Sequence, residues 1–370
     1  GNWYKISVSL DGIYKLDNND LQSLGIETSN LSVNSIKLFG NGGGMLPALN
    51  SDFRHNDLQE NAIQVVDLNG NGIFNSDDYI LFYGQSPHNW KYDSVSNIFN
   101  YSEHLFSDLN YYFITIDNSS GGKRINQKPI FTNFDKTIIA FNDFHVHEVN
   151  SENLIQSGRE WFGERFGIID SYSFNFNFPN LINSSPVTIK TSVAARSLNS
   201  SYFTVNANNN FISNINISNI VYDYATQYAR SVENTSQFNS NSDQITVNVE
   251  YNYSENNAIG WLNYIQLNSR RELRMHNDIL SFRDVESITN NQLGKYIISN
   301  SNLATQVWDI TDQLNIKKLP TNLTGSELTF IDSISILKSY YAFNNNYKKP
   351  SLIGEIENQN KGYLYIQQIQ

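Results

Sequence analysis

Strand-like segments follow one another at short intervals through the second half of this chain, with no helical pattern between them. The segment SYSFNFNF, residues 171–178, alternates polar and apolar residues strictly, and it is followed by VTIKTSVAARS, YFTVNANNNFI, QITVNVEYNYS and GWLNYIQLNSRREL. A period of two places the apolar side chains on one face of a strand. Short strands separated by Asn, Ser and Gly clusters are typical of antiparallel sandwiches. We therefore predict a jelly-roll-like antiparallel β-sandwich domain over residues 142–348.

The first 141 residues predict a separate N-terminal β-rich domain, so the whole chain is expected to be mainly β with few short helices. WYKISVSLDGIYKL, residues 3–16, alternates on both sides of Asp11 and Gly12, and a D-G pair in this setting predicts a hairpin. A short helix should follow, capped by Asn18 or Asn19 and ended by Gly25.

Composition narrows the classes of function. The chain has 370 residues, of which 39% are hydrophobic and 13% aromatic, enough to fill the cores of two or three domains. The formal net charge of -11 produces a field that repels nucleic-acid phosphates. The absence of cysteine excludes disulfides, thiolate metal sites and a cysteine nucleophile within these residues. No apolar run is long enough to predict a membrane-spanning helix, and the strand-like opening is compatible with a leader removed upstream.

The stretch DLNGNGIFNSDDYILFYG, residues 67–84, contains a loop with the ligand spacing of an EF-hand. That spacing places side-chain oxygens at positions 1, 3 and 5, a glycine at 6, a backbone carbonyl at 7 and a carboxylate at 12. Counted from Asp67, every one of these positions is filled, with Gly72 at the sharp turn. The predicted Ca²⁺ ligands are Asp67, Asn69, Asn71, Ile73, Asn75 and Asp78.

Two departures from the EF-hand pattern predict weak binding. Asn69 and Asn71 are neutral, and Asp78 stands where a longer glutamate is usual. We expect a structural Ca²⁺ site with a dissociation constant on the order of 10⁻⁴ to 10⁻³ M, as in extracellular modules. The flanks IQVVD and YILFYG are strand-like, so the loop would join two strands. The alternative is a plain turn, because Asn-Gly pairs and Asp are frequent in turns without any metal.

A pair of histidines and a group of arginines have both a chemical and a structural interpretation. His145 and His147 would share one strand face and, with Asp143 or Glu148, could bind a transition metal. Spacing alone is a weak signal, because no third histidine is near in sequence. The cluster of Arg270, Arg271 and Arg274 is interpreted as an internal ion-pair site rather than an anion receptor.

A pair of glutamates lies in the best candidate for a longer helix. SENLIQSGREWFGERFG begins at Ser151, which can cap it, and its apolar residues can share a face. Glu160 and Glu164 would then lie one turn apart, a separation that a glycosidase pair permits. Arg159 and Arg165 offer ion-pair partners instead, and the structural interpretation is favoured. These residues alone give no convincing catalytic centre, and no catalytic residue is assigned.

Seven segments between residue 3 and about residue 360 carry a family resemblance. They are WYKISVSLDGIYKL, KLFGNGGGMLPALNSDFRHNDLQENAI, FNSDDYILFYGQSPHNW, SGREWFGERF, AIGWLNYIQLNSRREL, VWDIT and IGEIENQN. Together they resemble the N-terminal, non-catalytic region of the PorU family, the type IX secretion system sortases of Bacteroidota. That family is similar to the gingipain-type cysteine peptidases.

The resemblance implies β-rich domains ahead of a caspase-like peptidase domain with a His–Cys dyad. Members of the family remove the C-terminal signal domain of secreted cargo and attach the cargo to anionic lipopolysaccharide. They are exported and work at the cell surface, on the outer face of the outer membrane, docked to a PorV-like barrel. Without cysteine, the dyad transfers to no residue of this sequence. Residues 349–370 are expected to form a tail leading toward the peptidase domain, and the role of this segment would be structural support and partner docking.

Two other functions remain as alternatives. The first is a calcium-stabilised jelly-roll module of a surface protein that binds glycan with exposed aromatics such as Trp90 or Tyr92. The second is a free-standing hydrolase that uses Glu160 and Glu164.

Overall fold

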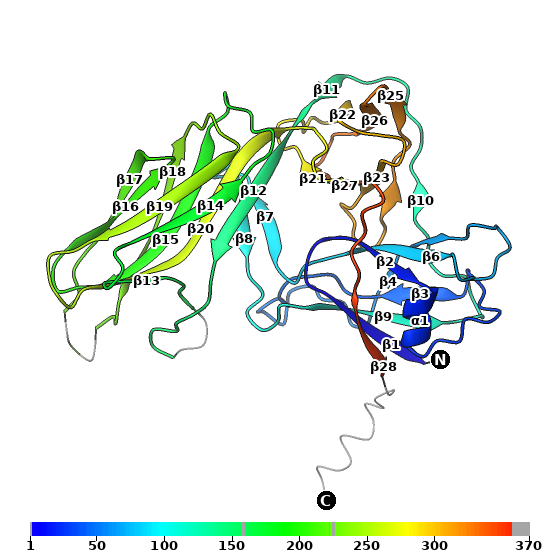
Figure 1. Ribbon diagram of the computed structural model, residues 1–370, viewed down its shortest axis with the longest axis horizontal. Coiled ribbons are helices and arrows are strands. Elements are labelled where there is room, and N and C mark those ends of the chain that lie inside the picture. Colours follow the sequence, from blue (N-terminus) through cyan, green and yellow to red (C-terminus); the bar gives the residue numbers. More distant parts are fainter. Residues whose placement is uncertain (1, 157–159, 222, 224–225, 357–370) are drawn as a thin grey trace, which may run out of the picture.

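The computed structural model describes residues 2–156, 160–221, 223 and 226–356, and over these residues the protein is nearly all β (Figure 1). Its strands form several mostly antiparallel sheets, and the described residues contain one short α-helix. The mainly β prediction is therefore confirmed. Within the described part of the chain no helix is long and apolar enough to cross a membrane.

An N-terminal unit packs two sheets around one core, at the lower right of Figure 1. The larger sheet has the order β28 (Ser351–Ile356), β1 (Trp3–Val8), β9 (Asn110–Ile116), β3 (Ile36–Phe39) and β4 (Glu60–Asn61). The smaller has the order β2 (Gly12–Asp17), β6 (Tyr79–Gly84) and β5 (Gln64–Val66). A two-stranded ribbon, β7 (Asn89–Asp93) with β8 (Ile98–Ser102), extends toward the next unit.

The predicted hairpin at Asp11 and Gly12 is wrong, because β1 and β2 belong to different sheets. β1 pairs with β9 and β28, whereas β2 pairs with β6. The edge of β2 that a hairpin would use is occupied by Lys348, whose carbonyl accepts from Lys15 N and whose N–H donates to Ile13 O. Gly12 also leaves room for the Lys348 side chain, because a Cβ there would lie 2.6 Å from Lys348 Cε. The turn thus carries the chain from one sheet to the facing one.

The predicted short helix is present as α1 (Asn18–Ser23), but its cap lies one residue earlier than expected. Asp17 Oδ1 accepts from Asp20 N, and Asp20 Oδ2 accepts from Asp17 N, which forms a capping box. Gly25 follows the helix with a positive φ of 92°, as expected of a helix stop.

The second unit, at the left of Figure 1, is a sandwich of two sheets with four main strands each. One sheet has the order β12 (Ala140–Glu148), β20 (Ile259–Glu272), β15 (Val187–Arg196) and β18 (Arg230–Phe238), with β13 (Arg165–Phe166) also paired to β20. The other has the order β14 (Ser171–Asn177), β19 (Gln244–Asn252), β16 (Ser201–Ala207) and β17 (Asn210–Ile217).

The order of these strands is that of a jelly roll. Counted along the chain without the short β13, the first sheet holds strands one, eight, three and six, and the second holds two, seven, four and five. The alternation in SYSFNFNF predicts the buried face correctly, because Phe174, Phe176 and Phe178 all lie in the core between the sheets. The predicted boundary between residues 141 and 142 falls within β12.

Further sheets, at the upper right of Figure 1, surround a core of their own. One has the order β10 (Asn126–Gln127), β24 (Lys317–Lys318), β23 (Gln306–Asp309), β27 (Ser339–Phe343) and β21 (Ile279–Arg283). The other has the order β11 (Lys136–Ile138), β22 (Leu293–Ile298), β26 (Glu327–Ser333) and β25 (Asn322–Thr324). The chain then returns through β28 to the N-terminal unit. The third unit is therefore built from strands on both sides of the jelly roll in sequence, β10 and β11 before it and β21 to β27 after it. Of the predicted tail, residues 357–370 lie outside the described residues.

The longer helix predicted from Ser151 is not present in the described residues of that segment. An antiparallel bridge joins Glu152 to Phe162 instead, and β13 follows on the edge of β20. Phe162 is buried with Trp261 in a small apolar cluster, so tertiary packing decides this conformation over local helix preference. Close packing also explains Gly163, where a Cβ would lie 2.9 Å from the Val149 carbonyl oxygen.

Candidate functional site

The calcium-type loop connects β5 to β6, which pair in antiparallel fashion with Val66 opposite Tyr79. The prediction that strands flank the loop is therefore confirmed. Asp78 is the buried member of the loop, with 1% of its surface exposed. Its Oδ1 accepts from Leu68 N at 2.8 Å and its Oδ2 accepts from Asn75 N at 2.6 Å. Asp78 thus ties both ends of the loop together.

Asp67 organises the first half of the loop. Its Oδ1 accepts from Gly70 N and its Oδ2 from Gly72 N, both at 2.8 Å. Both glycines have positive φ, 66° and 78°, which a residue with a side chain rarely adopts. The glycine at position 6 therefore has the turn-forming role that the EF-hand spacing assigns to it.

The remaining predicted ligands direct oxygens toward the same turn. Asn69 Oδ1 accepts from Asn71 N, and Asn71 Oδ1 accepts from Ile73 N. The Asn75 amide nitrogen donates to Ile73 O at 2.9 Å and to Asn71 Oδ1 at 3.2 Å. Two of the predicted ligand oxygens thus converge on one electropositive group, as they would on a cation.

These contacts bring the six predicted ligands into one loop and fit a hard cation in their donor chemistry. The described residues contain no group of three or more His, Cys, Asp or Glu side chains suited to a metal, so a cation bound here would need amide and backbone oxygens in addition to the carboxylates of Asp67 and Asp78. The same hydrogen bonds also close the loop as a turn, so Ca²⁺ binding stays a prediction.

The two histidines of β12 have separate partners. His147 Nε2 lies 2.8 Å from Glu164 Oε1, whereas His145 Nε2 lies 3.8 Å from Asp143 Oδ2. Burial lowers the pKa of His145, with Asp143 opposing the effect. Glu148 does not join them: burial and the neighbouring Glu103 raise its pKa to about 7. The structure therefore supports individual polar contacts for both histidines rather than a shared metal.

Glu160 and Glu164 do not form the pair expected of a helix. Glu164 is held by His147, and Glu160 Oε1 accepts a long hydrogen bond, 3.4 Å, from Asn263. Of their expected ion-pair partners, Arg159 lies outside the described residues and Arg165 begins β13. The free-standing hydrolase depended on these two glutamates lying one turn apart on a helix, and that arrangement is not present in the part of the chain that the structure describes.

Two of the three clustered arginines form internal ion pairs, as the sequence interpretation expects. Arg270 Nη1 lies 2.5 Å from Asp284 Oδ1, and Arg271 Nη1 lies 2.6 Å from Asp143 Oδ2. Arg274 is exposed.

Trp90 and Tyr92 are half-buried in packing contacts instead of forming an exposed platform. The Trp90 ring stacks on Phe144 with centroids 4.0 Å apart, and Tyr92 packs against Phe99 at 5.2 Å. The Tyr92 hydroxyl donates to Asn97 Oδ1. The Trp90 contact joins the ribbon of β7 and β8 to the sandwich and covers a ring face that a sugar would need, whereas the contacts of Tyr92 lie within the ribbon.

One feature had no signal in the sequence: a cavity of 530 Å³ where the three units meet. Its wall includes Gln85, which directly follows β6, Phe144 from β12 and Arg283 from β21. Residues so distant in the chain are brought together only by the packing of the units.

Taken together, the fold and its sites define a nearly all-β protein with a jelly roll and a calcium-type loop, and with no catalytic cluster recognised in the part of the chain that is described. No protein-family model matches the sequence, and no curated protein matches it. The fold is similar to the crystal structure of dimeric latent PorU from Porphyromonas gingivalis, with a TM-score of 0.81 and 19% identity. The similarity covers 97% of this chain and 33% of that one, so this chain spans about a third of its length. At this identity the likeness establishes the fold.

A second solved structure, the insecticidal delta-endotoxin Cry8Ea1 from Bacillus thuringiensis, matches 67% of this chain and 55% of that chain. The TM-score is 0.24 at 10% identity, too low to support an argument.

Proposed function

We propose that this chain forms the non-catalytic N-terminal region of a type IX secretion sortase of the PorU kind. The observation that carries the proposal is the fold similarity over 97% of the chain at a TM-score of 0.81. It extends over all three units and includes their relative arrangement, which a likeness of one common sandwich would not. The motifs from WYKISV to IGEIEN support the same assignment.

In this proposal the chemistry lies in a peptidase domain downstream of the region described. That enzyme would remove C-terminal signal domains from secreted cargo and attach the cargo to anionic lipopolysaccharide. The present chain contains no cysteine, and its two candidate catalytic glutamates are separately engaged. Its own role is to support the peptidase domain and to dock partners, among them cargo and a PorV-like outer-membrane barrel.

The proposed location is the outer face of the outer membrane, after export. The calcium-type loop suits that location, because a weak site fills only at the millimolar Ca²⁺ found outside cells. We propose that the ion, held by the loop oxygens of Asp67, Asn71 and Ile73 among others, stabilises the N-terminal unit and does not touch substrate.

The experiment that tests the docking role is co-purification of the chain with a PorV-like barrel from the same cells. We expect an affinity-tagged copy of residues 1–370 to retain the barrel in detergent, while an unrelated jelly-roll protein with the same tag does not. A correctly folded chain that never retains the barrel would count against docking. The parent assignment is tested separately by reading the gene beyond this segment, where a caspase-like domain lacking His and Cys would reject a sortase.

The jelly-roll topology favours one alternative, a glycan-binding module. Its expected aromatics, Trp90 and Tyr92, are engaged in packing, which weakens it. A glycan array probed with the intact chain distinguishes the two proposals, since neutral glycan binding that is lost in Tyr92→Ala would support the module.

A further inference from the structure

The cavity at the junction of the three units contains a buried cation without a close anionic partner. Arg283 is 9% exposed, and its Nη2 donates to Ser281 Oγ at 2.6 Å. Its guanidinium carbon lies 4.7 Å from the centroid of the Phe144 ring. Among the described residues, no carboxylate lies within the 4.0 Å of an ion pair with Arg283.

Two neighbouring arginines of low exposure, Arg270 and Arg271, do have such partners. Arg270 pairs with Asp284, and Arg271 pairs with Asp143 at 2.6 Å. A buried charge is strongly destabilising unless it is paired and hydrogen-bonded. Burial accordingly lowers the pKa of Arg283, and the more distant charge of Asp143 only partly opposes this effect. Arg283 is thus a desolvated donor with unused capacity at the wall of a cavity.

A second buried donor lies in the same wall. Gln85 is 3% exposed, and its Oε1 accepts from Gly43 N at 2.8 Å. Because only the oxygen can accept from a backbone N–H, this bond fixes the orientation of the amide. The opposite atom, Nε2, is buried without a hydrogen-bond partner. Unsatisfied buried donors are rare in folded proteins and call for a partner that the chain does not supply.

The size and wall of the cavity indicate the kind of ligand. A volume of 530 Å³ is in the range of small-molecule sites, which often lie between domains. A guanidinium matches a planar carboxylate with two parallel hydrogen bonds. Asp11 and Asp143 also line the cavity, and their charges disfavour a doubly charged phosphate more than a single carboxylate. Beside apolar side chains such as Ile310 and Leu337, the wall also carries side chains that can bind hydroxyl groups, namely Asn89, Thr311, Gln313 and Ser339.

We propose that this cavity binds a sugar acid, with its carboxylate on Arg283 and Gln85 and its hydroxyl groups on the surrounding amide and hydroxyl side chains. The Phe144 ring contacts both the Arg283 guanidinium and the Trp90 ring, and these contacts restrict the position of the guanidinium at the wall. The inference does not depend on the proposed sortase role, because it concerns a cavity built by the chain itself.

The test measures binding of sodium D-glucuronate to the intact chain by saturation-transfer NMR and calorimetry, with D-glucuronamide as the neutral analogue of the same shape. We expect glucuronate to bind at least tenfold more tightly than the amide. N-acetyl-L-alanine serves as a carboxylate without a sugar, and equal or tighter binding of this probe would overturn the assignment to a sugar acid. Failure of glucuronate to bind, or equal binding of the amide, would overturn the site.

Two variants locate the site. Arg283→Gln should reduce glucuronate affinity at least tenfold, while Arg274→Gln, which removes an exposed arginine, should leave it unchanged. Because Arg283→Gln can affect folding, Gln85→Glu provides an isosteric second variant that keeps the acceptor for Gly43 N and replaces the free donor with a negatively charged oxygen. Wild-type affinity in a folded Gln85→Glu protein would contradict the proposal.

Discussion

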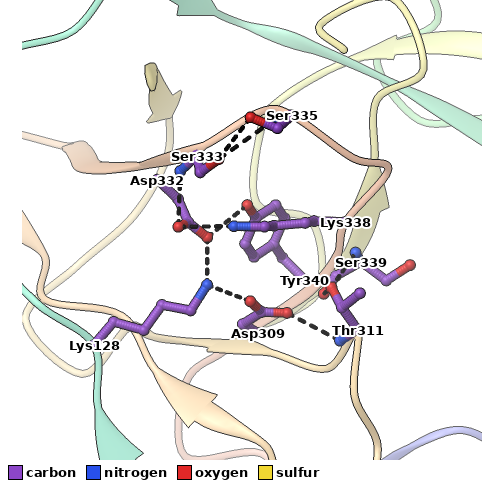
Figure 2. Close-up of polar contacts among 9 residues, drawn as sticks. All are labelled: Lys128, Asp309, Thr311, Asp332, Ser333, Ser335, Lys338, Ser339 and Tyr340. Carbon is purple, nitrogen blue, oxygen red and sulfur yellow. Dashed lines mark hydrogen bonds and ion pairs between the residues drawn. The ribbon is translucent and has the colours of Figure 1, made fainter. Parts of the chain in front are cut away.

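Lys128 Nζ lies 2.6 Å from Asp332 Oδ2, although 204 positions separate the two residues in the chain (Figure 2). Lys128 also donates to Asp309, and Asp332 accepts from Lys338 at 2.9 Å and from the Tyr340 hydroxyl at 2.9 Å. Both aspartates are buried, with 8% and 3% of their surface exposed. The network anchors the segment that enters the third unit to β23 and β26.

Lys128→Met should destabilise the protein by about 3 kcal/mol, because it leaves two buried carboxylates short of a cation. Lys349→Met is the matched control: its ammonium group also contacts two aspartates, Asp17 and Asp20, but the side chain is 54% exposed. Exposed pairs contribute about 1 kcal/mol or less. Urea unfolding of both variants measures the difference. Equal losses in the free energy of unfolding would show that the buried network contributes no more than the exposed pairs.

The pH dependence of the Lys128 network follows from its pKa shifts. Burial opposes ionisation of Asp332, but hydrogen bonds and charge from Lys128 and Lys338 outweigh it and hold the pKa of Asp332 below its ordinary value. The stabilisation is therefore present above the unfolded pKa of about 3.9 and is lost as pH falls through the lower folded value. Urea unfolding from pH 2 to pH 7 should show the wild type and Lys128→Met converging in acid. A constant difference would exclude this linkage.

The jelly roll could be predicted from the sequence because its signal is local. In SYSFNFNF each buried phenylalanine alternates with a polar residue, and the period alone fixes which face is buried. The calcium-type loop is equally local, since its six residues lie within twelve positions. Asp78 closes that loop through its own neighbours, as a turn of this spacing requires.

Long-range packing accounts for what the sequence did not reveal. Nothing near Asp11 and Gly12 indicates that Lys348 takes the edge of β2, so the two strands looked like a hairpin. The segment after Ser151 has a helical apolar spacing, but burial of Phe162 against the sandwich decides its conformation. The cavity around Arg283 is formed by three units and has no counterpart in local pattern.

Calcium should stabilise the N-terminal unit through Asp67. At about 10 mM Ca²⁺ and a dissociation constant on the order of 10⁻⁴ to 10⁻³ M, linkage predicts about 1.4 to 2.7 kcal/mol of added stability relative to EDTA. Asp67→Ala should abolish this increment, whereas Asp77→Ala, at an exposed position outside the hydrogen-bonded ring, should retain it. Differential scanning calorimetry with and without Ca²⁺ measures the added stability. A wild-type protein whose stability does not change with Ca²⁺ would show that the loop is a plain turn.

Glu148 should make the folded state less stable as pH rises toward neutrality. Burial and the charge of Glu103 raise the pKa of Glu148 to about 7, well above its unfolded value of about 4.3. Between these values the native state holds a proton that the unfolded state has lost, so the free energy of unfolding falls with increasing pH. Glu148→Gln should remove that slope, and Glu103→Gln should shift it to lower pH. Unfolding measured at pH 5 and pH 8 checks both, and an unchanged slope in Glu148→Gln would assign it to another group.

Gly260 provides a test of how tightly the jelly-roll core is packed. It lies in β20 beneath the stacked rings of Phe203 and Tyr251, and a Cβ there would fall 2.6 Å from Phe203 Cζ and 3.1 Å from Tyr251 Cδ1. Gly260→Ala should therefore destabilise the protein by about 1 to 3 kcal/mol, because the rings must move within a filled core. Gly121→Ala is the control, since a Cβ at that position has no atom within 4 Å. Chemical unfolding of both variants gives the comparison. A Gly260→Ala protein as stable as the control would mean that the core accommodates the added methyl group without loss of stability.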